Sequence, residues 1–363
     1  MKNLNTRYSD DAGSLQTDLS ATIQVPYTFN ADDKSYRFRI HGDRAYKLAI
    51  GFLIEPGKTE YAERALEIIN QWSGQCRQFT GGNAALEAGW GLAGMARAAE
   101  LLRAKFPGYK SKFNEDQFKT FVDSVLKPWL VSYYKKERSW IPHGNWGSTI
   151  VQARMQYAIF AEDSTEFSNL EDEAKQVLSN ILETKNFQMV KPENRPKGPV
   201  ERGHSSETRR DLAHAAFGIG GLIDIAEMLH NQGSSVDLYA YKDNLLAAAV
   251  EYEARCVAGD YPNDIKSWVQ AKDEQQLKDW YFTGWYPYQM NWDMGYHHYT
   301  NRKGLDMPHT KKVLTEPLIS PREPGRPRKA RSELFLHGLG LTTITHYGMT
   351  ANEDQKSQAA CMI

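Results

Sequence analysis

The sequence predicts an all-α protein folded as an α/α toroid, a barrel of antiparallel helical hairpins with roughly six or seven pairs, possibly open. Three observations lead to this prediction. Apolar residues recur with helical spacing along most of the chain, the links between these segments are short, and strand patterns are scarce. Helical hairpins stack into either a solenoid or a toroid, and the lack of a repeat of fixed length favours the toroid.

Periodicity and end signals predict the first helices in order. One covers residues 59–72 and the next covers 83–105. A third is expected over 114–135, with Asn114 as its N-cap and a kink at Pro128.

Four further helices complete the regular part of the chain. The second of them is expected to open with a capping box at Ser168, and the third is expected to stop at Gly233. They cover residues 145–161, 168–184, 206–231 and 235–257.

The whole chain, residues 1–363, is expected to form one catalytic domain, because no linker rich in Gly, Ser or Pro divides it. Residues 1–40 are an N-terminal extension, and 318–331 is a basic surface loop. After residue 258 the sequence is aromatic and irregular, with a helix near 273–285 and a helix or strand over 333–347.

Charge and hydropathy exclude several classes of protein. Lys and Arg number 44 and Asp and Glu number 45, so the net charge of −1 gives no basic surface for nucleic acid. The mean hydropathy is −0.61 and no run of about 18 apolar residues exists, so no membrane span is expected. The three cysteines fit neither a disulfide scaffold nor a metal site. The opening residues lack the apolar segment of a signal peptide, so the chain is either a mature secreted or periplasmic form, which we expect, or an intracellular protein.

Aromatic residues make up 12% of the chain, with 19 Tyr and 9 Trp. Their apolar faces and polar edges suit the binding of sugar rings, and they equally suit a packed core. Composition alone leaves both interpretations open.

The first candidate site lies in residues 203–232. Opposite the apolar stripe of the expected helix stand Glu207, Arg210 and His214, followed on the same face by Gly218 and Gly221. A glycine inside a helix costs about 0.5–1 kcal/mol relative to alanine, which favours a face that something approaches closely. The alternative is a solvated face with a Glu207–Arg210 ion pair.

A second candidate is the Asn145–Trp146 pair at a predicted helix start. The carboxamide of Asn145 can donate and accept hydrogen bonds, so it suits a carboxylate or carboxylic acid. The alternative is a helix cap followed by a buried tryptophan.

The third candidate is residues 291–302, which combine tyrosine, histidine and arginine without a regular period. Irregular polar and aromatic segments of this kind are typical of binding and catalytic sites. The spacing of His297, His298 and His309 matches no zinc motif, so we expect no metal.

Three passages together resemble the alginate lyase superfamily of polysaccharide lyases. The helix motif runs from Arg210 through Leu212 and His214 to Ala226, and it is accompanied by residues 83–102 and by the Asn145–Trp146 pair. The resemblance spans about residues 43–257. It implies an α/α toroid, a cleft for a uronic acid polymer, and β-elimination without a redox cofactor.

The resemblance also implies residue roles. Asn145 matches the family asparagine that neutralises the substrate carboxylate, and His214 stands where the family motif carries a catalytic tyrosine. We therefore expect proton transfer to have moved to the tyrosines of 296–299, in a divergent branch acting on mannuronate-rich alginate or on glucuronan.

The chemistry of β-elimination then assigns the roles. The carboxylate must be neutralised, and the candidates for this are Asn145 and Arg210, with His204 as a further one. A base must then remove the C5 proton. Tyr299 is the expected base and acid, with Tyr296 as second choice and His214 as partner or alternative base. We expect six residues to contact the substrate: His204, Glu207, Trp146, His298, Arg302 and Arg202. The basic stretches 191–210 and 322–331 either line the cleft or form solvated loops.

Two alternatives remain open at this stage. A glycoside hydrolase on the same toroid would use paired carboxylates, for which Asp264, Asp279 and Asp293 are candidates. A non-catalytic uronate-binding protein would keep the helical shell. The partner expected in each case is an anionic polysaccharide, with neither nucleic acid nor membrane, and the sequence leaves the oligomeric state and the particular uronate open.

Overall fold

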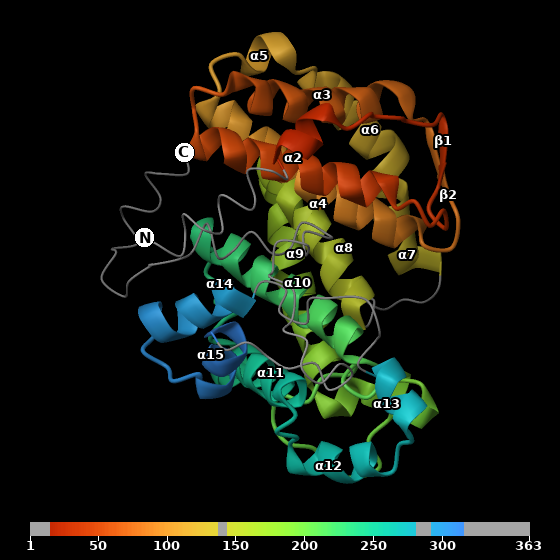
Figure 1. The fold of residues 1–363 in the computed structure, drawn as a ribbon, viewed down its shortest axis with the longest axis vertical. Helices are drawn as coiled ribbons and strands as arrows, with labels where there is room; N and C mark the ends of the chain where they lie inside the picture. Colours follow the sequence, from red (N-terminus) through yellow and green to blue (C-terminus); the bar gives the residue numbers. More distant parts are fainter. Residues whose placement is uncertain (1–14, 137–143, 281–291, 316–363) are drawn as a thin grey trace.

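A computed structural model describes residues 15–136, 144–280 and 292–315 of the chain, and its main elements are four helical hairpins. In each hairpin the first helix lies in an inner row and the following segment packs outside it (Figure 1). The hairpins are α2 (Arg37–Ile54) with α3 (Thr59–Gln75); α4 (Ala84–Lys105) with α6 (Glu115–Phe121), η1 (Val122–Leu126) and α7 (Lys127–Lys136); α8 (Gly144–Ala161) with α9 (Ser164–Leu182); and α10 (Leu212–Asn231) with α11 (Tyr241–Ala258).

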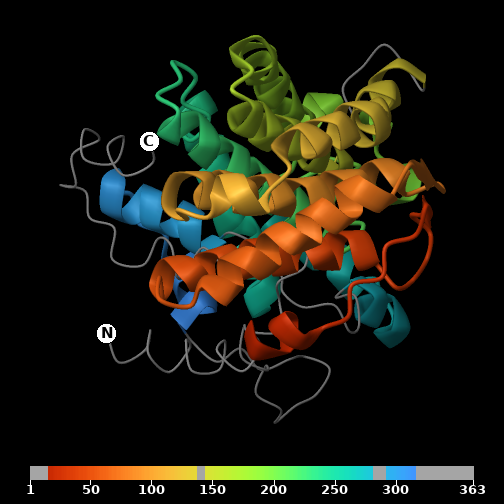
Figure 2. The same cartoon turned by 90° about the horizontal axis from the view of Figure 1, so that it is seen from above.

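Shorter elements complete the described fold. The parallel strands β1 (Thr28–Asn30) and β2 (Gln78–Thr80) pair beside the first hairpin. The remaining elements are α5 (Tyr109–Lys112), η2 (Thr184–Met189), η3 (Pro192–Asn194), α12 (Asn263–Gln270), α13 (Glu274–Trp280), α14 (Trp292–His297), η4 (His298–Arg302) and α15 (Pro308–Thr315). Figure 1 shows α2 and α3, in red and orange, at one end of the molecule and α12 and α13 at the other, and Figure 2 looks onto the end that α2 and α3 form.

The four inner helices run parallel to one another. Contacts join the early residues of each inner helix to early residues of the next, and later residues to later ones. These contacts are Arg39–Glu87 and Tyr46–Arg97 between α2 and α4, Gly89–Thr149 and Arg97–Gln156 between α4 and α8, and Asn145–Gly218 and Ser148–Gly221 between α8 and α10. Parallel inner helices joined by outer helices that run back make an α/α toroid, so the predicted fold class is confirmed.

Glycines let the inner helices approach closely. A β-carbon on Gly94 would lie 2.5 Å from the carbonyl oxygen of Gly42 in α2, and one on Gly221 would lie 2.8 Å from Cβ of Ser148 in α8. Gly218 likewise faces the main chain of Asn145. The close approach expected at Gly218 and Gly221 is therefore present, and the group that approaches them is the neighbouring helix α8.

Much of the aromatic content fills the interior. One apolar core lies within the N-terminal hairpins and includes Phe38 and Trp72, and a second lies among α9 to α11 and α14 and includes Trp280 and Trp292. α10 is long and apolar enough to cross a membrane, but 89% of the window that passes this test is buried inside the protein. Burial on all sides explains its uniformly apolar sequence.

Several helix ends follow from local chemistry. Asn114 caps α6 as predicted, since its side chain accepts a hydrogen bond from the N–H of Gln117 at 3.1 Å. Close to Pro128, where a kink was expected, the structure has the π-helical turn η1, which ends two residues earlier. The prediction of a cap at Ser168 was wrong, because Asp163 caps α9 and the helix begins at Ser164.

Other boundaries differ because of tertiary contacts. α10 begins at Leu212 with Asp211 as its cap, six residues later than predicted, and α11 begins at Tyr241. α2 was not predicted, because the buried polar residues Arg39 and Asp43 interrupt its apolar face. Residues 318–331 and 333–347 lie outside the described residues, as do 281–285 of the helix expected near 273–285.

Candidate active site

The N-terminal ends of α8 and α10 meet around the carboxylate of Glu207. Oε1 of Glu207 lies 3.4 Å from the main-chain N–H of Asn145, and Oε2 accepts a hydrogen bond from Arg210 at 3.3 Å. Gly144 precedes Asn145 with a φ of 57°, and a side chain there would collide with the Glu207 carboxylate. The carboxylate is therefore held against the positive end of the α8 dipole.

His214 stands in the first turn of α10 and contacts Asp211. Its ring Nδ1 lies 2.6 Å from Oδ2 of Asp211, and its main-chain N–H donates to Oδ1 of Asp211 at 2.8 Å. The side chain of His214 is 23% exposed and that of Arg210 is 44% exposed. Both groups therefore reach the surface beside the buried Glu207.

Asn145, whose main-chain N–H faces Glu207, is 2% exposed. Its carboxamide Oδ1 accepts no hydrogen bond from any residue that the structure describes. A buried polar atom without a partner costs about 1–3 kcal/mol, so such an atom usually has a functional explanation. A hydroxyl or carboxylic acid of a ligand would satisfy it.

An aromatic wall continues from His214 toward α4 and α2. Phe217 lies 6.3 Å from the ring of His214 and 6.1 Å from the ring of Trp90. Arg39 stacks between Trp90 at 4.3 Å and Tyr36 at 4.1 Å. The guanidinium of Arg39 also pairs with the buried Glu87 of α4.

Three residues around the site were not predicted from the sequence: Asp211, Trp90 and Phe217. Asp211 had a readable signal, since an aspartate directly before the first residue of an apolar helix is a typical N-cap. Trp90 and Phe217 had none, because an aromatic residue inside a helix usually belongs to a core.

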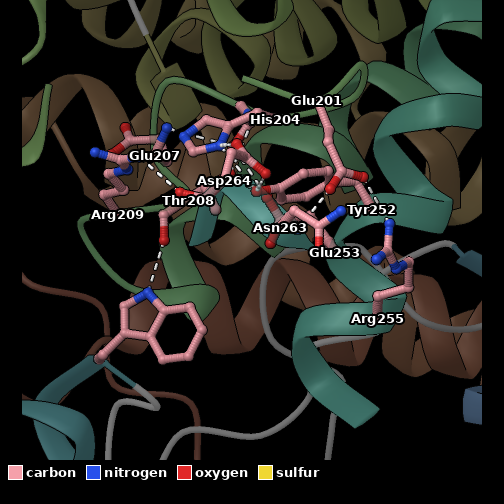
Figure 3. A network of polar contacts seen from close by, with 12 residues as sticks. Glu201, His204, Glu207, Thr208, Arg209, Tyr252, Glu253, Arg255, Asn263 and Asp264 are labelled. Carbon is pink, nitrogen blue, oxygen red and sulfur yellow. Dashed lines mark hydrogen bonds and ion pairs between the residues drawn. The ribbon is translucent and has the colours of Figure 1, made fainter. Parts of the chain in front are cut away.

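A buried polar network holds the segment that leads into α10 (Figure 3). Nδ1 of His204 lies 2.8 Å from Oδ2 of Asp264 and 2.9 Å from the hydroxyl of Tyr252, which donates to the other oxygen of Asp264. His204 is buried, and burial lowers its pKa. The expectation that His204 contacts the substrate was therefore wrong, because it anchors this segment on α11 and α12.

Glu253 forms the second part of the same network. Its carboxyl group is fully buried and accepts hydrogen bonds from the hydroxyls of Ser205 and Thr208. Burial raises the pKa of Glu253 to about 7. The carbonyl of Thr208 in turn accepts a hydrogen bond from the indole of Trp280 at 2.7 Å. Residues 205–208 are thus held from two sides, directly before the site.

The tyrosine and histidine cluster of η4 belongs to the core, which corrects two predicted roles. Tyr299 is fully buried, and its hydroxyl donates to the carbonyl oxygen of Tyr239 at 2.9 Å. Burial also raises the pKa of Tyr299 far above its usual value, so it is unsuited to act as a base. The ring of His298 stacks on Tyr239 at 3.6 Å, and burial lowers the pKa of His298 to about 3.

Arg302 and Tyr296 are separated from the site in the same way. Arg302 forms two hydrogen bonds of 3.0 Å with the carboxylate of Glu227. Glu227 follows His214 by 13 residues in α10, which is about 20 Å along a helix axis. Tyr296 is half-buried against the second core, in the helix that precedes η4. Residues 292–302 therefore do not converge with Asn145, and the expectation that they do was wrong.

The other two predicted binding residues also have defined places. Arg202 donates to the carbonyl of Lys242 at 2.7 Å and pairs with Asp243 at 3.0 Å, so it secures the first turn of α11 and its predicted role in binding is not supported. Trp146 is half-buried and packs against the N-terminal core, next to Asn145. Of the predicted site residues, the structure brings together Asn145, Glu207, Arg210 and His214, with Trp146 adjoining them.

Parallel inner helices with charged side chains gathered at their N-terminal ends define this protein as an α/α toroid with an end-on polar site. Residues 28–261 match the model of the family described as alginate lyase, which covers more than half of the chain. The chain therefore belongs to the alginate lyase family, a family of polysaccharide lyases, and the predicted resemblance is confirmed. The matched segment includes Asn145, Arg210 and His214 and ends before α14.

The fold is shared with a solved structure. The crystal structure of alginate lyase A1-III from Sphingomonas species A1 superimposes with a TM-score of 0.55 at 17% sequence identity. The match covers 87% of this chain and 77% of that one. No curated protein sequence matches the chain.

Proposed function

We propose that this protein cleaves a β-1,4-linked uronic acid polymer by β-elimination, with polymannuronate or glucuronan as the substrate. The observation that carries the proposal is the convergence of Asn145, Arg210 and His214 at the N-terminal ends of α8 and α10. We also propose that the protein acts outside the cytoplasm, where such polymers are met.

The first requirement of the reaction is neutralisation of the substrate carboxylate, because the C5 proton is not acidic while that charge persists. The exposed guanidinium of Arg210 supplies the positive charge, and the amide Nδ2–H2 group of Asn145 donates to the carboxylate, assisted by the positive end of α8. Glu207 orients the guanidinium before the substrate enters. Donors fixed in advance stabilise the developing negative charge more than mobile ones do.

The second requirement is a base, and His214 takes the role first expected for Tyr299. The C5 proton passes to Nε2 of His214, the electron pair of that bond forms the C4=C5 double bond, and the C4–O4 bond breaks. The departing oxygen then takes the proton back from His214 and becomes the anomeric hydroxyl of the released chain. In mannuronate and glucuronate the proton and the leaving oxygen lie on the same side, so one group can serve as base and acid.

The third requirement is a surface for the sugar rings. Phe217 and Trp146, which are both half-buried, flank the polar residues and offer apolar faces of the kind that sugars stack on, and the buried Trp90 packs against Phe217. Arg39, held between Tyr36 and Trp90 and paired with Glu87, is buried and fixes the position of the Trp90 ring.

The test is the ultraviolet absorbance of unsaturated products when the purified protein is mixed with polymannuronate or glucuronan. We expect absorbance to rise with at least one polymer and to be lost in His214→Gln. New reducing ends without absorbance would instead identify a hydrolase, and tight binding without turnover would identify a binding protein. Either result would overturn the proposal.

A further inference from the structure

We propose that Asp211 is a positioning residue that fixes the imidazole of His214 as the Nδ1–H tautomer, so that Nε2 faces the substrate as the proton acceptor. The inference rests on the proposed function, since it explains how His214 serves as the base. It concerns a residue that neither the family resemblance nor the sequence pattern had placed in the site.

The geometry of the carboxylate carries the argument. Oδ1 and Oδ2 of Asp211 lie 2.8 Å and 2.6 Å from Nδ1 of His214. An ionised carboxylate only accepts hydrogen bonds, so the ring nitrogen between these oxygens must carry a proton. A neutral imidazole has one N–H, and its lone pair is therefore on Nε2.

Asp211 is itself rigidly placed. It is 6% exposed, and Oδ1 also accepts the main-chain N–H of His214 as the N-cap of α10. Nε of Arg210 lies 3.9 Å from Oδ2, beyond hydrogen-bond distance. One side chain therefore starts the helix and orients the ring that the same helix carries.

A purely structural role makes a different prediction, because serine caps helices about as well as aspartate. Asp211→Ser keeps an oxygen for the helix end, but its shorter side chain withdraws from the imidazole. If Asp211 only caps α10, this variant should retain full activity.

The experiment compares Asp211→Ser with Asp163→Ser. Asp163 caps α9 in the same way, accepting the N–H of Glu166 at 2.9 Å, and is exposed. We expect Asp211→Ser to lower kcat about 100-fold, within the range typical of general base catalysis, with KM changed less than about threefold. Both variants should keep thermal stability close to that of the wild type, and Asp163→Ser should keep kcat.

Nitrogen-15 NMR of the imidazole of His214 gives a readout independent of turnover. The wild type should show a protonated Nδ1 and an unprotonated Nε2 above neutral pH, and Asp211→Ser should lose this preference. Wild-type kcat in Asp211→Ser, or a wild-type ring protonated on Nε2, would overturn the inference. A wild type that yields no unsaturated product would overturn the proposed function instead, while the NMR result would still decide whether Asp211 sets the tautomer.

Discussion

The carboxylate of Glu207 occupies the space in which a β-carbon on Gly144 would lie. Gly144 also has a φ of 57°, a conformation that side chains other than glycine adopt at a cost of about 1–2 kcal/mol. The start of α8 and the position of Glu207 therefore depend on each other, although the two residues are far apart in the sequence.

This relationship predicts the effect of Gly144→Ala. The added methyl group should displace Glu207 and with it the guanidinium of Arg210, lowering kcat/KM at least tenfold and the free energy of unfolding by about 1–3 kcal/mol. Turnover assays and denaturant titrations measure the two effects. Gly198→Ala is the matched control, since Gly198 is exposed and an added β-carbon would meet nothing within 4 Å. Unchanged activity in Gly144→Ala would show that Glu207 does not position Arg210.

Arg210→Gln should lower kcat/KM about 100-fold, because it removes the charge that neutralises the substrate carboxylate. The loss should be largest at low ionic strength, where electrostatic binding is strongest. Arg103→Gln is the control, since Arg103 pairs with Glu100 in the last turns of α4, at the opposite end of the inner helices from the site. Equal kinetics for the two variants would remove Arg210 from the site.

Tyr299→Phe tests whether Tyr299 is a core residue, as in the structure, or the catalytic base expected from the sequence. The variant loses one buried hydrogen bond, to the carbonyl of Tyr239. Its free energy of unfolding should therefore be lower by about 0.5–1.5 kcal/mol, and its kcat should be unchanged. Thermal unfolding and initial rates on the same preparation check both statements. A loss of kcat without a loss of stability would restore Tyr299 as the base.

Glu253 predicts a dependence of stability on pH. Its pKa is about 7 in the folded protein and 4.5 in the unfolded chain, so between these values only the unfolded chain is ionised. The contribution of Glu253 to the free energy of unfolding should therefore fall as pH rises from 4.5 to 7, by up to about 3 kcal/mol.

The side chain in Glu253→Gln stays neutral at every pH. The free energy of unfolding of this variant, relative to that of the wild type, should therefore increase as the pH is raised from 5 to 8. The low pKa of His298 acts in the opposite direction, but it cancels when the two proteins are compared at each pH. Denaturant titrations at both pH values measure the difference. Parallel pH profiles for the two proteins would contradict the assignment.

The sequence predicted those site residues whose place depends on where a helix starts. Asn145 at a helix start and Arg210 and His214 around the next start were readable, because capping signals and helical periodicity are local properties. The role of Tyr299 was not readable. A tyrosine beside histidines has the same composition in a site and in a core, and only the distant Tyr239 and Glu227 decide between them.

The same reason explains the other differences. His204 carries the chemistry of a binding residue, but Asp264 and Tyr252, 48 or more residues away in the chain, hold it in the interior. Gly221 indicated a close approach correctly, but a single helix pattern does not reveal that the approaching group is Ser148 of α8.

The glycine contacts between the inner helices have a consequence for comparing distant relatives. The helices approach too closely for a side chain where Gly42 meets Gly94 and where Gly221 meets Ser148, so a residue inserted into one helix would rotate every later contact by about 100°. Insertions and deletions among relatives should therefore collect in the connections and spare these crossings. Alignments anchored on the crossing points should keep Asn145 and His214 in register at identities too low for ordinary matching.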